Sequence, residues 1–330
     1  MAYLAEYIWS DANGELRSKT KVVKSDTFDD WNYDGSSTGQ AEGSNSEVVI
    51  RAVKSVPDPF RRTANGNRLV LCDTWVYNED KELVPHSTNN RHFASKLLKE
   101  CPKGNRFGFE QEFYLMKDRY PFCAKAPPRE QGEYYCGVGG ENALGRDLME
   151  KVLDNCIYAG LPITGMNAEV GPSQWELQVC SDDIDAGDSL MLLRYIISRT
   201  CEEKEVVVTL HPKPMGGDWN GSGCHTNFST AAMREEGGHD LIVNVMEKFE
   251  KLRNEHIAVY GSNNEQRLTG LHETAHIDNF SWGYGDRGAS IRIPLQCKVD
   301  NRGYFEDRRP ASNIDPYKVM HRILSTVYDI

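Results

Sequence analysis

The chain has 330 residues, a formal net charge of −11 and 39% hydrophobic residues, which suits one large domain or two unequal ones. The acidic balance disfavours a nucleic-acid or anionic-membrane surface, and no run approaches the ~18 apolar residues of a membrane span. The nine cysteines form no Cys-x-x-Cys pair, and the N-terminus lacks the regions of a signal peptide. We therefore expect reduced thiols and a cytoplasmic location.

The first 83 residues predict a small, mostly β domain. Residues 3–9 and 16–23 alternate like strands around a turn signal, and 48–53 and 69–77 indicate two further strands. The polar segment 25–46 between them is rich in Asp, Gly, Ser and Asn. A loop of this length inside a compact domain is usually functional or mobile.

Residues 84–330 predict a larger domain in which helices and strands are mixed. The junction at 85–88 offers capping residues for a helix that holds Phe93, Leu97 and Leu98. A helix over 147–160 is indicated by an apolar stripe of Leu148, Met149, Val152, Leu153, Cys156 and Ile157. Further helices are predicted over 186–203, 240–260 and 315–328. The fold class is therefore predicted to be α+β.

The segment 106–116 predicts a strand with two unlike faces. Its apolar face carries Phe107, Phe109, Phe113 and Leu115. Its polar face carries Glu110 and Glu112, roughly 7 Å apart along the strand. Carboxylates so placed repel each other, and a cation beside them relieves the repulsion. Taken alone, this stretch is better explained by a half-buried strand with a solvated acidic face.

Two later segments present polar groups in the same way. Gly171-Pro172 predicts a hairpin turn across which Glu169 and Glu176 can face each other. After a glycine-rich loop at 220–223, the side chains of His225, Asn227 and Ser229 share one face of a strand. A lone histidine is more often a structural residue than a ligand, and a surface hairpin with exposed acids is about as frequent as a functional one. Neither segment alone therefore identifies a site.

The C-terminal third adds arginines to these acids. Glu306 and Arg308 share one face of a strand, and Arg267, Arg287 and Arg292 precede them. Fixed arginines beside carboxylates suit the bidentate holding of carboxylate and phosphate groups. The chain has no complete P-loop or dinucleotide fingerprint, and neither a serine-hydrolase elbow nor a zinc-protease pair. Any nucleotide must therefore be held through metal ions and arginines.

These segments resemble the glutamine synthetase family, type II. Six motifs occur in order between about Trp31 and Tyr317, and so cover nearly the whole chain. They are Asp34-Gly-Ser-Ser-Thr38, Phe107-Gly-Phe-Glu-Gln-Glu112, Asn167-Ala-Glu169 with Gln174-Trp-Glu176, Asp218-Trp-Asn-Gly-Ser-Gly-Cys-His225-Thr-Asn227, Arg267-Leu-Thr-Gly270 with His272-Glu-Thr274, and Phe305-Glu-Asp-Arg-Arg-Pro310.

The resemblance implies a β-grasp domain at 1–83 and a catalytic domain of curved antiparallel strands with flanking helices at 84–330. It implies ring-shaped homo-oligomers, a decamer of two pentamers, with active sites at subunit boundaries. The implied reaction joins ammonia to the side-chain carboxylate of glutamate through a γ-glutamyl phosphate, with ATP as substrate and Mg²⁺ or Mn²⁺ as cofactor. The products are glutamine, ADP and phosphate.

The resemblance also implies roles for individual residues. The ligands of one metal ion are Glu112, Glu169 and Glu176, and those of the other are Glu110, His225 and Glu306. Glutamate is bound by Asn220, Gly221, Arg267 and Arg287, and ATP and its phosphates by Asn227, Ser229, Arg292 and Arg308. Glu273 resembles the flap glutamate that closes the site and accepts a proton from ammonium. Asp34 resembles the ammonium-site aspartate of the neighbouring subunit.

The sequence departs from the family pattern in places. Leu271 stands where a lysine is common, and Val170-Gly171-Pro172 differs from the usual turn. Two other classes of protein share some of these features: a ligase acting on a larger amine, and a non-catalytic descendant or metal-binding protein. The ammonium-sized site expected at Asp34 and Glu273 argues against the first. The complete set of six ligands and four arginines argues against the second.

Overall fold

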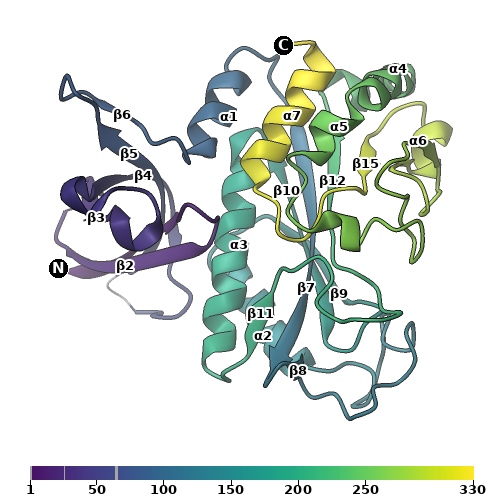
Figure 1. Cartoon of the computed structure of the whole chain (residues 1–330), viewed down its shortest axis with the longest axis horizontal. Helices are drawn as coiled ribbons and strands as arrows, with labels where there is room; N and C mark the ends of the chain where they lie inside the picture. The colour runs from purple at the N-terminus through teal and green to yellow at the C-terminus, as the bar shows by residue number, and fades with distance from the viewer. Residues whose placement is uncertain (1, 26, 64–65) are drawn as a thin grey trace.

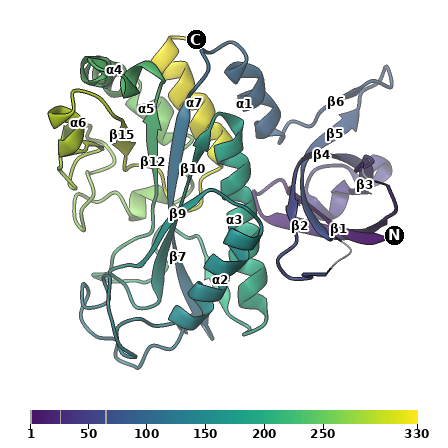
Figure 2. The same ribbon diagram turned by 180° about the vertical axis from the view of Figure 1, so that it is seen from behind.

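Two β-sheets with a long helix between them organise the computed structural model, which describes residues 2–25, 27–63 and 66–330. Figures 1 and 2 show the small N-terminal sheet on one side of α3 (Ile184–Glu202) and a large sheet on the other. Helices and mainly antiparallel strands are mixed along the chain, which confirms the predicted α+β class. Within the described ranges, no helix combines the length and apolar character needed to cross a membrane.

The small sheet contains the predicted N-terminal strands. Its members are β1 (Tyr3–Ser10), β2 (Leu16–Val23), β3 (Trp31–Asp34), β4 (Glu47–Pro57), β5 (Arg68–Tyr77) and β6 (Leu83–Pro85). The order is β2-β1-β5-β4-β3, β6 pairs with β5, and β1 runs parallel to β5. The segment expected to be one long loop instead contains β3 and two 3₁₀ turns, η1 (Gly35–Thr38) and η2 (Gly43–Asn45). Asp26 of that segment lies outside the described residues.

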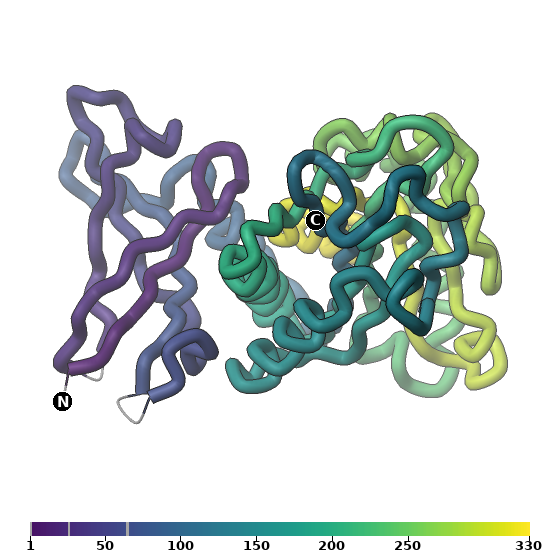
Figure 3. Tube along the Cα trace, turned by 90° about the horizontal axis from the view of Figure 1, so that it is seen from below, coloured from purple at the N-terminus to yellow at the C-terminus, as the bar shows by residue number. Residues whose placement is uncertain are grey.

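The two faces of the small sheet are buried against different partners. Tyr7 and Trp9 belong to a core of the small lobe itself. Ile8 and Leu71 belong to the main core, which also contains α3. Figure 3 shows the small lobe beside α3, and Figures 1 and 2 show β3, which ends at Asp34, away from the large sheet. The small lobe is therefore packed on the rest of the chain by one face of its sheet.

The large sheet carries the polar strands singled out in the sequence. Its members are β7 (Arg106–Lys117), β8 (Tyr120–Pro121), β9 (Ile163–Ala168), β10 (Gln174–Asp182), β11 (Val207–Thr209), β12 (Cys224–Ser229), β13 (Trp282–Tyr284), β14 (Ile291–Ile293) and β15 (Phe305–Asp307). The order is β13-β14-β15-β12-β7-β10-β9, and β8 and β11 also pair with β7. The predicted apolar face of β7 is confirmed, since Phe107, Phe109, Phe113 and Leu115 are fully buried.

The helices agree with the prediction apart from some details and the unpredicted α6 (Leu295–Val299). The others are α1 (Asn90–Leu98), α2 (Arg146–Tyr158), α3, α4 (Gly238–Lys251), α5 (Arg253–Ile257) and α7 (Pro316–Tyr328), with 3₁₀ turns η3 (Ala232–Arg234) and η4 (Asn264–Gln266). Helices α2 and α3 pack against this sheet, and α1 packs against α3 and α7. The helix predicted over 240–260 breaks at Leu252, after which His256 is buried and bonded to Thr326 of α7. Ile157, placed on the buried stripe of α2, is 63% exposed. Helix α1 is capped by Asn89 rather than by residues 85–88.

Candidate active site

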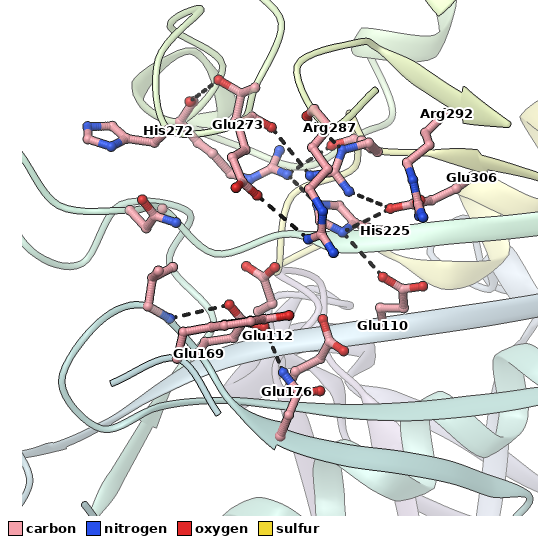
Figure 4. Close-up of a pocket in the computed structure, with 18 of the residues that line it drawn as sticks. Glu110, Glu112, Glu169, Glu176, His225, His272, Glu273, Arg287, Arg292 and Glu306 are labelled. Atoms are coloured by element: carbon pink, nitrogen blue, oxygen red, sulfur yellow. Dashed lines mark hydrogen bonds and ion pairs between the residues drawn. The ribbon is translucent and has the colours of Figure 1, made fainter. Parts of the chain in front are cut away.

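A cavity of about 590 Å³ opens over the polar face of the large sheet. Strands β7, β10, β12 and β15 supply its floor, and loops supply its rim (Figure 4). Its lining includes Glu110, Glu112, Glu169, Glu176, Asn220, Gly221, His225, Arg267, Glu273, Arg287, Arg292, Glu306 and Arg308. The structure therefore brings thirteen of the sixteen residues implied by the resemblance into one pocket.

Strand pairing explains why these side chains meet. In the β7–β12 ladder Glu110 lies opposite His225, and in the β7–β10 ladder Glu112 lies opposite Glu176. Directly opposed residues of an antiparallel pair have side chains on the same face, about 5 Å apart at Cβ. The neighbouring pair β12–β15 brings Glu306 to the same face. A shared register across four strands thus assembles residues nearly 200 positions apart in sequence.

The first cluster contains Glu110, His225 and Glu306. The Nδ1 atom of His225 lies 3.4 Å from Glu110 Oε2 and 3.5 Å from Glu306 Oε1. Burial, followed by the charge of Arg308, holds the pKa of His225 well below its ordinary value. The imidazole is therefore neutral at neutral pH, which is the form that binds metals. Potential ligand atoms of all three residues lie within 4.8 Å of one another.

The second cluster contains Glu112, Glu169 and Glu176, whose ligand atoms also lie within 4.8 Å of one another. Burial and the neighbouring carboxylates raise the pKa of Glu112 to about 8, of Glu169 to about 7 and of Glu176 to about 8. Three buried acids with raised pKa values repel one another once they are ionised. A divalent cation among them removes that repulsion, and carboxylate oxygens are its preferred ligands. Both clusters therefore fit metal ions.

Arginines surround the first cluster on the side of β14 and β15. Arg292 NH1 lies 2.5 Å from Glu306 Oε2, and Arg308 NH1 lies 2.6 Å from Glu306 Oε1. Arg308 is nearly buried, whereas the side chain of Arg292 is 29% exposed. This part of the pocket combines fixed positive charge with an acidic cluster, which suits a phosphate-bearing ligand.

Arg267 is held deep in the pocket by backbone groups. Its NH2 donates to the carbonyl of Arg308 at 2.8 Å and lies 3.1 Å from His225 Nε2. Burial lowers the pKa of Arg267 to about 10, so the guanidinium stays charged at neutral pH. A Cβ at Gly223 would stand 2.5 Å from Arg267 NH2, and one at Gly221 would stand 2.7 Å from its Cγ. The glycines of the 220–223 loop are therefore required by the close approach of Arg267.

Residues 270–276 form a loop over the pocket, called the flap below. Glu273 points into the pocket toward Arg287, with 3.7 Å between its Oε2 and Arg287 NH1 (Figure 4). Both side chains are more than half exposed. Arg308 donates to the backbone carbonyl of Glu273 at 3.4 Å. An acid thus lies at the mouth of the pocket without a tight partner.

Three residues implied by the resemblance lie outside the lining of the pocket. Asn227 donates to Glu110 Oε1 at 2.8 Å, and Ser229 accepts from Arg234 at 2.9 Å. Asp34 lies in the small lobe, where it is exposed and accepts hydrogen bonds from Ser36 and Ser37. Those hydrogen bonds, led by Ser36, lower the pKa of Asp34. The chain does not bring its own Asp34 to its own pocket.

Several polar residues of the pocket were missed in the sequence. Gln178 donates to Glu176 Oε1 at 2.6 Å, and Asn167 donates to Glu169 Oε1 at 2.8 Å. The sequence spacing could have indicated both contacts, because Gln178 and Asn167 each stand two positions from the glutamate that they contact. Tyr135 and His272 also line the pocket, from loops whose paths carry no periodic signal.

Comparison with known proteins agrees with this geometry. Residues 90–329 match the family model described as "Glutamine synthetase, catalytic domain". The chain is 49% identical to a glutamine synthetase of Emericella nidulans, with 98% of this chain and 92% of that protein aligned. It is 48% identical to the nodule isozyme of Lupinus luteus (98% and 94% aligned) and to the enzyme of Saccharomyces cerevisiae (98% and 89%). The chain therefore belongs to the type II glutamine synthetase family.

Proposed function

We propose that the chain carries out its ATP-dependent synthesis of glutamine through a γ-glutamyl phosphate formed in this pocket. A carboxylate is a poor acyl electrophile, and transfer of the γ-phosphoryl group of ATP turns it into an acyl phosphate. Ammonia then attacks the carbonyl carbon and phosphate leaves. The first step gathers negative charge, so it requires cations in a site with little water.

The two acidic clusters would hold one divalent ion each. Glu110, His225 and Glu306 would bind one ion, and Glu112, Glu169 and Glu176 the other. Oxygen-rich ligation favours Mg²⁺ or Mn²⁺, and the single histidine accommodates Mn²⁺ well. When bound, such ions polarise phosphoryl oxygens and offset their charge. Five carboxylates and two divalent ions leave one net negative charge before ATP arrives, so the arginines are needed as well.

The remaining polar groups divide between the two larger substrates. Asn220, Gly221 and Arg267 would hold glutamate, with Arg287 toward the phosphate that forms. Arg292 and Arg308 would hold the phosphates of ATP, and Asn227 and Ser229 would lie along the nucleotide. Support comes from the position of the arginines: Arg267 is fixed deep in the pocket, while Arg292 and Arg308 stand at Glu306.

Ammonium must lose a proton before it can attack. Glu273, which points into the pocket without a tight partner, would accept that proton. Asp34 of a neighbouring subunit would bind the ammonium ion. This assignment agrees with the position of Asp34, which is exposed in the small lobe and does not line the pocket of its own chain.

The assembly and the domain division belong to the same proposal. Ring-shaped homo-oligomers, such as a decamer of two pentamers, would place the small lobe of one subunit against the pocket of the next. The small lobe, at about 1–83, would be a β-grasp domain, with the catalytic domain at 84–330. A cytoplasmic location fits the nine cysteines, which are all unpaired and lie within the described ranges.

The observation that carries the proposal is the meeting of two acidic clusters with four arginines in one cavity. The test is an assay with ATP, Mg²⁺ and glutamate labelled with ¹⁸O in its side-chain carboxylate, with and without ammonium. We expect phosphate that carries one ¹⁸O atom, because the leaving phosphate keeps a carboxylate oxygen. Glutamine formation with unlabelled phosphate would exclude the acyl phosphate.

A further inference from the structure

One side chain on the flap joins three loops at the rim of the pocket. The Nε2 atom of His272 lies 2.8 Å from Asp218 Oδ1, and its Nδ1 atom lies 3.0 Å from Gln131 Nε2. Gln131 Oε1 in turn accepts from the backbone N–H of Asn220 at 2.5 Å. His272 thus links the flap to the loop that carries Asn220, both directly through Asp218 and through Gln131.

The donors and acceptors of this link are mutually consistent. Because Gln131 Oε1 accepts from Asn220, its amide group turns toward His272 and donates to Nδ1. Nδ1 is then the acceptor of the ring, so Nε2 carries the hydrogen and donates to Asp218. One neutral tautomer therefore satisfies every contact, and the chain of hydrogen bonds runs without a break from Asn220 to Asp218.

The backbone conformation of the flap needs stabilising contacts from residues outside the flap. His272 has φ 55° and Glu273 has φ 58°, so two consecutive side-chain-bearing residues lie in the left-handed region. That region is unfavourable for residues with a Cβ, and it persists where surrounding contacts fix it. The side chain of His272 is only 19% exposed, whereas that of Glu273 is 61% exposed. His272 therefore anchors the conformation that directs Glu273 into the pocket.

At the tip, the carbonyl of Glu273 accepts a long bond of 3.4 Å from Arg308, and the shorter contacts lie within the flap or at its base. A bridge between Thr269 and His276 closes the base, and Thr274 Oγ1 donates to the carbonyl of Leu271 at 2.8 Å. Figure 4 shows the ring of His272 directed away from the carboxylates while Glu273 points toward them. Asp218 is 92% exposed, so its bond to His272 is weak enough to open and close during turnover.

We propose that His272 is a positioning residue that fastens the flap when glutamate occupies the Asn220–Gly221 loop. Ordering of Asn220 by glutamate orders Gln131, which in turn orders His272 and the flap. The closed flap keeps water from the acyl phosphate until ammonia attacks. The inference rests on the role proposed above for Glu273. If the flap stays open, water attacks the γ-carbonyl, phosphate leaves and glutamate is regenerated, so ATP is hydrolysed to ADP and phosphate.

The test measures glutamine and ADP in the same reaction for the full-length His272→Ala variant. We expect the ratio of glutamine to ADP to fall severalfold and KM for ammonium to rise, with KM for ATP unchanged. His272→Gln should restore part of the coupling, because its amide nitrogen can replace Nε2 as the donor to Asp218. Asp218→Ala should lower the ratio as well, and the double variant should be no worse than His272→Ala, since both remove one bond.

The matched control is His276→Ala. His276 lies at the base of the same flap, and its half-exposed ring contacts Asp278 only at 3.3 to 3.5 Å. This variant should keep the wild-type ratio. If His272→Ala fails to fold, Asp218→Ala carries the test alone. Wild-type coupling in His272→Ala, or equal losses in both histidine variants, would overturn the proposal. Failure of the wild-type chain to couple ATP to glutamine would instead overturn the function proposed for the pocket.

Discussion

The floor and the rim of the pocket are built in opposite ways. On the floor, Glu112, Glu176 and His225 stand on paired strands and are buried. On the rim, Glu273 and Arg287 stand on loops, and their side chains are 61% and 53% exposed. Mutually repelling carboxylates must be held in fixed positions, and the paired strands of a sheet provide such positions. A rim that admits substrates must open, and loops with few contacts can open readily.

A buried polar network strengthens the floor from below. Gln111 lies on the apolar face of β7 and accepts from Arg194 at 2.7 Å. Arg194 also donates to the carbonyls of Ser312 and Ile314, and Ser312 Oγ donates to the carbonyl of Glu112. The backbone beneath the second cluster is thus fixed by several bonds, whereas the tip of the flap is held by the bonds of His272 and by one long bond from Arg308.

The largest effect is expected from changes to the floor. Glu112→Ala and Glu306→Ala should each lower glutamine formation on the order of 10³-fold, because each removes a metal ligand and an organiser of nearby charge. Circular dichroism should show a folded protein, since these side chains belong to the site rather than to the apolar core. Near-normal turnover of either variant at saturating Mg²⁺ would contradict the assignment.

A subunit-mixing experiment tests whether the rim is completed by a second chain. Asp34→Ala and Arg308→Ala should each be nearly inactive, the first through lost ammonium binding and the second through lost phosphate contacts. In rings assembled from equal amounts of both, about one interface in four should combine two intact residues and recover activity. No recovery in rings shown to be mixed would defeat the shared site, and Asp34 would need another explanation.

A smaller effect is expected on the stability of the metal-free floor. The folded-state pKa of Glu176 is raised from an ordinary 4.5 to about 8 by burial and neighbouring acids. Protonated Glu176 therefore contributes to the stability of the fold near pH 5, and this contribution is lost as the pH rises through about 8. Glu176→Gln should raise the free energy of unfolding by about 2 kcal/mol at pH 8.5, and by less at pH 5.5.

Urea unfolding in EDTA at the two pH values measures this difference. Gln178→Glu serves as the opposite control, since it adds an acid beside Glu176 and should destabilise the protein most at pH 8.5. A Glu176→Gln variant less stable than wild type at both pH values would show that this carboxylate supports the metal-free fold rather than opposing it.

The sequence predicted the floor better than the rim. The alternation in β7 separated Phe107 and Phe109 from Glu110, and the structure confirms that separation. Gln111 interrupts the apolar face, and its role could not be predicted, because its partners Arg194 and Ser312 lie 83 and 201 positions away.

On the rim, the resemblance implied roles for Glu273 and Arg287 but none for His272 or Tyr135. His272 and Tyr135 sit on loops whose course depends on contacts with other loops, and local pattern does not encode such contacts. The positive φ of His272 and Glu273 is equally invisible in the sequence, since only a few per cent of residues other than glycine adopt it. Asp34 was predicted to act in a neighbouring subunit, and its exposed position agrees with that prediction without testing it.

On the proposed mechanism, the floor of the pocket activates glutamate and the rim delivers ammonia in place of water. This division of work is tested most directly by the ratio of glutamine to ADP that Glu273→Ala forms at saturating glutamate and ATP. We predict continued ADP formation with a ratio well below that of the wild type, because activation survives while deprotonation of ammonium and exclusion of water are lost. Wild-type rates of both products, or a parallel fall of both with the ratio unchanged, would contradict it.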